Sequence, residues 1–298
     1  MTKTSLTPMV YKVGRYPVSV ISADLNNDSM LAFAVANNGA HTVTVMLGVK
    51  NGTFHTLMNH TVGLHQTSVI AADFNNDHKL DLVVTNNGDT SISVLLNNGD
   101  GHFSTRMDIV VGKKPNMATA ADFNSDGNID LVVVNSGEQT SSVLFGSGNG
   151  TFQASEKYRV GASPFWVVSV DFNNDKINDL AVTNYGDATV SILLGVGSGM
   201  FRARANFTVG LYPRTMVSDD FDGDGKSDLA VISAGDNSIN IMVGNGDGSF
   251  QTPSKFGTGD VPLFMTMGDL NNDQRPDLVV TNRYALSLSV LLNVCHKY

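Results

Sequence analysis

The 298-residue sequence has few of the features that mark several large classes of protein. Its single cysteine, Cys295, excludes an internal disulfide, and we expect this thiol to pack as a small apolar side chain rather than act as a nucleophile. Charged residues make up only 16% and form no basic run, which argues against disorder and against nucleic-acid binding. No stretch approaches the ~20 apolar residues of a membrane span, and residues 1–14 show no signal-peptide pattern.

Helical and catalytic patterns are missing as well. No segment carries apolar residues at helical spacing over ten or more positions. There is no nucleophile elbow, no HExxH motif and no phosphate loop, and the seven histidines share no repeat position. These absences predict an all-β protein without catalytic activity, and we expect it to be monomeric.

What the sequence does contain is a short acidic stretch that returns six times. Its first residue recurs every 49 positions, at Asp24, Asp73, Asp122, Asp171, Asp220 and Asp269. The six stretches hold 18 of the 28 acidic residues, so the net charge of −9 is concentrated in them. Carboxylates this close repel one another, and bound divalent cations would neutralise them.

Each stretch has the residue types of a calcium loop. Oxygen-bearing side chains stand at the first, third, fifth and ninth places, and we expect a backbone carbonyl at the seventh, which is an oxygen-only set suited to Ca²⁺. Five loops are complete, and the first is weakened because its ninth place is Ala32. The predicted ligands are Asp24, Asn26 and Asp28; Asp73, Asn75, Asp77, Lys79 and Asp81; Asp122, Asn124, Asp126, Asn128 and Asp130; Asp171, Asn173, Asp175, Ile177 and Asp179; Asp220, Asp222, Asp224, Lys226 and Asp228; and Asp269, Asn271, Asp273, Arg275 and Asp277.

Similar residue types also occur in EF-hands and in the Asx turns of hairpins. An EF-hand is excluded because its twelfth place needs a bidentate Glu, whereas this sequence has apolar residues there, such as Val84 and Val133. Plain Asx turns that cap a hairpin remain the alternative to calcium binding.

The rest of the 49-residue unit reads as four short strands. In the second unit, residues 68–73, 81–85, 91–96 and 106–111 are rich in β-branched residues and are bounded by Gly-containing turns. Four-stranded units of this length are typical of β-propeller blades, whereas a parallel β-helix has much shorter coils. Residues 5–298 divide into six such units. We therefore predict one domain over residues 1–298, a six-bladed propeller closed by the segment Thr7 to Val13 as fourth strand of the C-terminal blade.

The phased loops, with Gly and Pro before them and Phe-containing turns after them, resemble the FG-GAP/VCBS repeats of integrin α-subunit propellers and of many secreted proteins. The resemblance covers essentially the whole chain. It implies a calcium-bearing propeller outside the cell or at its surface, usually an adhesion or ligand-binding module. Sequons at Asn51, Asn59, Asn149 and Asn206 agree with that location, whereas the one at Asn27 lies inside a loop. Integrin propellers have seven blades, so the six-blade count departs from the family pattern.

The repeats differ most where the chain enters each first strand, on the face we expect opposite the metal loops. We predict that this rim binds a protein or glycan. Unselected drift of solvent loops would produce the same divergence, and a polysaccharide lyase or a bare scaffold in a larger secreted protein is the alternative function. The predicted rim residues are Arg15, Tyr16, His65, Lys114, Phe165, Trp166, Tyr212, Arg214, Phe264 and Tyr284.

Overall fold

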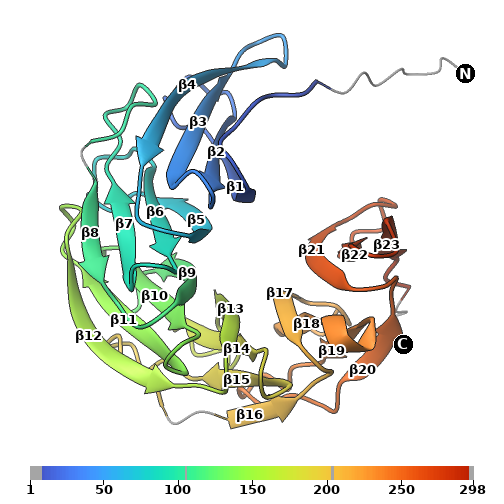
Figure 1. The fold of residues 1–298 in the computed structure, drawn as a ribbon. Coiled ribbons are helices and arrows are strands. Elements are labelled where there is room, and N and C mark those ends of the chain that lie inside the picture. The colour runs from blue at the N-terminus through green and yellow to red at the C-terminus, as the bar shows by residue number, and fades with distance from the viewer. Residues whose placement is uncertain (1–8, 105, 203–204, 295–298) are drawn as a thin grey trace, which may run out of the picture.

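The protein is a β-propeller of six antiparallel sheets that follow one another around a central axis (Figure 1). The computed structural model describes residues 9–104, 106–202 and 205–294. Five sheets have four strands in simple chain order, and the last has three. The structure confirms the predicted all-β fold and the six repeated units. Cys295 lies outside the described residues.

The strand bounds repeat with the sequence period. The first three sheets are β1 (Pro17–Ala23), β2 (Ala32–Asn37), β3 (Thr42–Gly48) and β4 (Phe54–Thr61); β5 (Gln66–Ala72), β6 (Asp81–Asn86), β7 (Ser91–Leu95) and β8 (Met107–Val110); and β9 (Pro115–Ala121), β10 (Asp130–Asn135), β11 (Thr140–Gly146) and β12 (Phe152–Arg159). The last three are β13 (Pro164–Val170), β14 (Asp179–Asn184), β15 (Thr189–Leu193) and β16 (Ala205–Thr208); β17 (Pro213–Asp219), β18 (Asp228–Ser233), β19 (Ser238–Met242) and β20 (Ser254–Gly257); and β21 (Pro262–Gly268), β22 (Asp277–Asn282) and β23 (Ser287–Leu291).

The described part of the chain has one helix, the 3₁₀ turn η1 (Ala234–Asp236), which the sequence did not predict. It replaces the tight turn between β18 and β19, and its C-cap Asn237 is left-handed at φ 51°. Nothing in the described residues is a helix long and apolar enough to cross a membrane.

The hydrophobic core is divided into five clusters, one between each pair of successive sheets. For example, one cluster joins Val43 and Val45 of β3 to Val69 of β5 and Val84 of β6. Equivalent clusters join the second to the third sheet, and so on to the sixth. Each sheet buries the face that its neighbour covers, as the packing of propeller blades requires.

The two ends of the first strands define two faces of the molecule. At one end, each segment that enters a first strand bonds to the turn between the second and third strands, as when Asn87 N–H donates to the His65 carbonyl at 3.1 Å. At the other end lie the acidic loops, which bond to the turns between third and fourth strands, as when Gly150 N–H donates to the Phe74 carbonyl at 2.9 Å. The rim segments and the acidic loops therefore lie on opposite faces, as predicted.

The predicted closure of the ring is not seen. Over the described residues the last sheet consists of β21, β22 and β23 alone, and residues 9–13 form no strand. In Figure 1 the first and last sheets stand apart. Closure by the N-terminal strand, two of whose residues lie outside the described part, stays a prediction.

Candidate metal loops and ligand rim

All six acidic loops share one backbone conformation. The fourth and sixth places are left-handed in every loop, for example Asn76 at φ 58° and His78 at φ 63°, although most of these residues are not glycine. This conformation is uncommon for residues with a Cβ. It curls the backbone so that the first Asp accepts N–H groups from the fifth and sixth places, at 3.2 and 2.9 Å in the case of Asp122.

The curl brings the alternating side chains together. In the fifth loop, carboxylate oxygens of Asp220, Asp222 and Asp224 all lie within 4.8 Å of one another. In four loops the third place is an Asn whose amide donates to the fifth-place carboxylate, as from Asn124 to Asp126 at 3.0 Å. The first, third and fifth places are thus neighbours, as the ligand pattern predicted.

The seventh-place residue closes the loop through its backbone. Its N–H donates to the fifth-place carboxylate, as from Asn128 to Asp126 at 2.8 Å, and this bond holds the pKa of Asp126 below its usual range. The same bond is made by Lys79, Ile177, Lys226 and Arg275. In addition, the ammonium of Lys226 lies 2.7 Å from Asp224, where it offsets part of the negative charge of the fifth loop.

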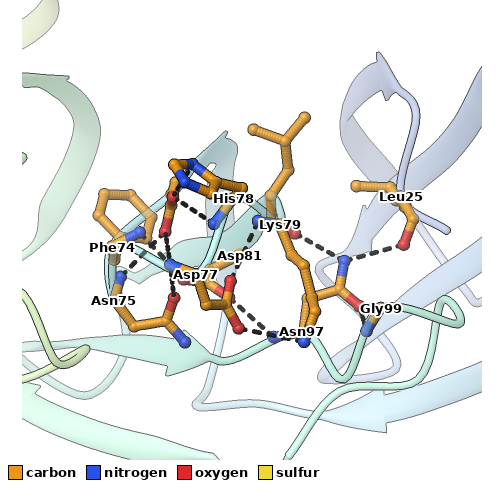
Figure 2. Close-up of polar contacts among 11 residues, drawn as sticks. Leu25, Phe74, Asn75, Asp77, His78, Lys79, Asp81, Asn97 and Gly99 are labelled. Atoms are coloured by element: carbon orange, nitrogen blue, oxygen red, sulfur yellow. Dashed lines mark hydrogen bonds and ion pairs between the residues drawn. The ribbon is translucent and has the colours of Figure 1, made fainter. Parts of the chain in front are cut away.

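The ninth-place Asp has a structural role that spacing alone did not predict. Asp81 is fully buried, and its two oxygens accept N–H groups from Phe74 at 2.9 Å and from Asn97 at 2.8 Å (Figure 2). Asp130, Asp179, Asp228 and Asp277 make the same pair of bonds. This carboxylate therefore fastens the start of the acidic loop to the end of the third strand.

Burial also raises the pKa of four of these carboxyl groups, those of Asp81, Asp130, Asp179 and Asp228. Removing them from water disfavours the charged form and raises the pKa of Asp81, Asp179 and Asp228 to about 6. The acids of the same loop add repulsion, in the case of Asp81 from Asp77 and Asp73. A cation between these groups would reverse that effect.

The first loop keeps the fold without this fastening. Asp24 still accepts N–H groups from Asp28 at 3.2 Å and Ser29 at 2.8 Å, and Asn26 still donates to Asp28 at 2.9 Å. Ala32, which is 1% exposed, takes the ninth place and brings no oxygen. Weaker metal binding at this loop stays a prediction.

The loops also connect successive sheets. The Asn97 amide, which is buried, donates to the carbonyls of Leu25 at 2.8 Å and Leu80 at 2.9 Å, so it joins the acidic loops of the first two sheets (Figure 2). Asn293 repeats the contact on the Phe221 carbonyl at 2.7 Å. A conformational change in one acidic loop would therefore alter hydrogen bonds at the boundary with the next sheet.

The donor chemistry of the loops fits a hard cation. Each loop carries oxygen-bearing side chains at three alternate places, which converge as carboxylates in the fifth loop, and a buried carboxylate follows at the ninth place in five loops. The first, third, fifth and ninth places carry no histidine or cysteine, which disfavours Zn²⁺ and copper. The residues present could hold Ca²⁺ at the loops.

On the opposite face, the structure brings some predicted rim residues together and leaves others apart. The guanidinium carbon of Arg214 lies 5.2 Å from the ring centre of Phe165 and 5.4 Å from that of Tyr185, and Tyr185 stacks on Tyr212 at 4.8 Å. Arg214 Nε is buried and has no hydrogen-bond partner among the described residues. An unpaired buried donor beside three aromatic rings is a feature that a ligand could satisfy.

A second aromatic contact lies near the axis. Trp166 and Phe264 occupy the same place in sheets that are two apart, and their ring centres meet edge to face at 5.9 Å. Trp166 lies on the wall of a cavity of about 500 Å³ formed by the first strands, together with Ile70, Met117 and Met267. This wall is largely apolar.

The other rim residues are separate. Arg15 lies over Tyr16 at 5.9 Å in the first sheet, and Tyr284 pairs with Arg283 at 5.6 Å in the last. His65 meets His41, a turn residue, at 5.3 Å. Lys114 shares with Tyr16, His65 and Tyr212 the left-handed place that precedes each first strand. The predicted rim is therefore one compact cluster on the fourth and fifth sheets with scattered residues around it.

Comparison with known proteins bears on the repeats and the fold. A family model described as FG-GAP-like repeat matches residues 24–84, 73–133, 122–182, 171–231 and 220–280. No curated protein sequence matches the chain.

Three solved structures illustrate the similarity in fold. A functionally unknown protein from Desulfotomaculum acetoxidans has a TM-score of 0.73 at 13% identity, with 96% of this chain and 85% of that chain covered. A putative 6-phosphogluconolactonase from Bacteroides uniformis has a TM-score of 0.69 at 13% identity, covering 95% and 86%. The periplasmic gluconolactonase of Pseudomonas aeruginosa has a TM-score of 0.64 at 14% identity, covering 94% and 74%. At these identities the similarity concerns the fold alone.

Proposed function

Because the chain belongs to the FG-GAP-like repeat family, we propose that it is a calcium-stabilised, non-catalytic ligand-binding or adhesion module that acts outside the cell. The observation that carries the proposal is the common geometry of the six acidic loops. The fourth and sixth places are left-handed in all six loops, and in the fifth loop three carboxylates gather within 4.8 Å. Like charges held this close favour a bound cation.

Calcium in these loops would stabilise the whole propeller. At a free concentration ten times the dissociation constant, one bound ion adds about 1.4 kcal/mol, and five ions add about 7 kcal/mol. A whole domain is stable by roughly 5–15 kcal/mol. The first five loops are bonded to the next sheet, so the gain would act at the boundaries between sheets.

We propose an extracellular location on the basis of the same loops. Solvent-exposed loops of this kind belong to the weaker calcium sites, which fill at the millimolar Ca²⁺ found outside cells. Filling five loops would also remove the net charge of −9.

The partner would bind the rim, on the face opposite the loops. Arg214 offers an unpaired donor, and Phe165, Tyr185 and Tyr212 offer flat apolar surfaces. Aromatic and arginine side chains dominate binding surfaces of this type. A protein segment or a glycan with an anionic group would match this combination. We also propose that the N-terminal segment takes part in closing the ring, since Tyr11 already lies against Phe54.

Metal analysis after equilibrium dialysis tests the calcium proposal. We expect about five ions per chain at millimolar Ca²⁺, and one fewer in the variant Asp224→Ala. The matched control is Asp247→Ala, which removes an exposed acid outside the acidic loops and should leave the number unchanged. Absence of bound calcium in the wild-type protein would overturn the proposal.

Screening on arrays of acidic and neutral oligosaccharides and on immobilised matrix proteins tests the rim. Binding should fall at least tenfold in Arg214→Ala, whereas Arg202→Ala, an exposed arginine outside the rim, should bind as the wild type does. Equal binding by both variants would count against the rim. Release of unsaturated uronide products during the screen would favour a lyase instead.

A further inference from the structure

The first sheet has an apolar face that nothing covers in the described structure. Val20 of β1 has a counterpart at the same place in each later sheet: Val69, Ala118, Val167, Met216 and Met265. Those five are at most 2% exposed because each packs in the cluster shared with the preceding sheet, whereas Val20 is 61% exposed. The first sheet is therefore built to receive a preceding sheet.

The last sheet has an uncovered apolar face on its opposite side. Leu288 of β23 is 64% exposed, although Val43, Ile92, Val190 and Ile239 at the same place are fully buried against the following sheet. Leu270 is 52% exposed, whereas its counterparts, among them Phe74 and Phe123, are at most 8% exposed. The last sheet is therefore built to receive a following sheet.

The last sheet also lacks an apolar side chain that completes the others. Phe201 fills the space beside Leu180, Leu193 and Tyr158, with its ring centre 5.4 Å from that of Tyr158. The corresponding space in the last sheet is a cavity of about 370 Å³, lined by Leu278, Leu291 and Phe256. In the fourth sheet this space is filled by Phe201, which is followed by the fourth strand, so the cavity has room for a corresponding Phe and strand.

The N-terminal segment lies on the other side of the same opening. Tyr11 packs edge to face on Phe54 at 5.8 Å, and its hydroxyl accepts the Phe54 N–H at 3.1 Å. Tyr158, on the fourth strand of the third sheet, makes the same two contacts with Phe201 of the fourth. Residues 9–13 thus follow the course of a fourth strand that belongs to a sheet preceding the first.

The size of the missing sheet can be judged from proteins of the same fold. The match with the D. acetoxidans protein covers 96% of 298 residues, about 286, and these are 85% of that chain, so about 50 of its residues lie outside the match. The same calculation gives about 46 residues for the B. uniformis protein and about 98, close to two repeats, for the P. aeruginosa gluconolactonase. One repeat of this chain has 49 residues.

We propose that the opening between β1 and β23 is a docking site for one further blade of the same 49-residue repeat. This blade would cover Val20 on one side and Leu288 on the other, and residues 9–13 would serve as its outer strand. Both faces continue the pattern of the five existing boundaries between sheets, so the partner is an antiparallel sheet with two apolar faces. The ring would close with seven blades.

A fusion to the full chain tests this directly. Position 299 is in phase with Phe250, so a second copy of residues 250–298 is appended after Tyr298. The probe is alkylation of Val20→Cys in a Cys295→Ser background. We expect at least tenfold slower alkylation in the fusion than in the unfused chain, together with a higher melting temperature. In the matched control, the Met of the appended copy that corresponds to Met265 is replaced by Asp. Val20→Cys in this control should be alkylated as fast as in the unfused chain.

Two other alkylation results would overturn the proposal. Slow alkylation of Val20→Cys in the unfused monomer would mean that the six sheets close directly, and slow alkylation with elution as a dimer would mean that a second copy fills the opening. If the fusion does not fold, oxidation of Val20→Cys with Phe264→Cys in the unfused chain decides. Ser19 and Val69, at the same two places in the first two sheets, are in contact, since the Val69 N–H donates to Ser19 Oγ at 3.3 Å. An intramolecular disulfide needs Cα atoms within about 7 Å. Its formation would contradict a blade-wide opening, and its absence supports one.

Discussion

At the scale of single residues, the ninth-place Asp separates folding from metal binding. In the wild-type protein the buried N–H groups of Phe221 and Gly244 donate to Asp228 at 2.9 and 2.7 Å. The variant Asp228→Ala removes this acceptor from both. An unsatisfied buried donor costs about 1–3 kcal/mol, so we expect a loss of roughly 2–6 kcal/mol in the free energy of unfolding, even in chelator. Urea unfolding measures it.

The control is Asp224→Ala in the same loop. Its side chain is partly exposed and lies outside the hydrophobic core. In chelator we therefore expect its free energy of unfolding to change by no more than about 0.5 kcal/mol. With Ca²⁺ present the same variant should lose stability. Equal losses for both variants in chelator would mean that the ninth-place Asp has no separate role.

The raised pKa values give the calcium-free protein an unusual dependence on pH. Asp81, Asp179 and Asp228 have pKa values of about 6 when folded, above that of an unfolded Asp. A raised pKa gives stability that is present below the unfolded value and is lost as pH rises through about 6. In chelator, the melting temperature should therefore fall between pH 5 and pH 7.5.

Asp228→Asn isolates this effect, because it removes one titrating group and should flatten the slope. His60 acts in the opposite direction, since burial lowers its pKa and its charging destabilises the fold as pH falls. With Ca²⁺ the slope should reverse, because calcium binds ionised carboxylates. A melting temperature in chelator that rises from pH 5 to pH 7.5 for wild type and variant alike would contradict the assignment.

Residue types and their spacing were enough to predict which side chains meet at the loops. The pair of hydrogen bonds accepted by the ninth-place Asp was not predictable, because one of the two donors lies 16 residues further on, at the end of the third strand. A periodic Asp is equally compatible with a ligand and with a buried acceptor.

At the scale of elements, we expect the hydrogen bonds between a loop and the next sheet to couple the unfolding of neighbouring sheets. Asn97→Ala removes two buried bonds to the carbonyls of Leu25 and Leu80. Each such bond contributes about 0.5–1.5 kcal/mol, so we expect a loss of roughly 1–3 kcal/mol, with earlier hydrogen exchange in β1 and β2. Asn98→Ala, whose side chain is exposed, is the control and should resemble the wild type. A loss that is the same in both variants would contradict a bond between sheets.

Strands were the best predicted elements. The second repeat follows the expected segments within one or two residues, because β-branched runs lie between turns rich in Gly and Asn. The turn η1 was not predictable, since Ala234 to Asp236 replace the Asn-Gly-Asp type of turn without any helical pattern around them.

At the scale of the whole molecule, a repeat period fixes the architecture of each unit better than it fixes closure. The arithmetic of 49-residue units predicted six blades correctly. It also predicted that the sixth blade meets the N-terminal strand, but the described structure leaves Val20 and Leu288 exposed on either side of an opening. The angle between successive blades decides how many fill a circle, and packing sets that angle.

The central claim is that cations in the acidic loops hold the propeller together. It is tested most directly by the melting temperature of chelator-treated protein as free Ca²⁺ is raised from micromolar to millimolar, with Mg²⁺ at equal ionic strength as the control. We predict a rise of many degrees that continues with the logarithm of Ca²⁺ concentration and is not reproduced by Mg²⁺. A melting curve that does not move with Ca²⁺ would contradict the account.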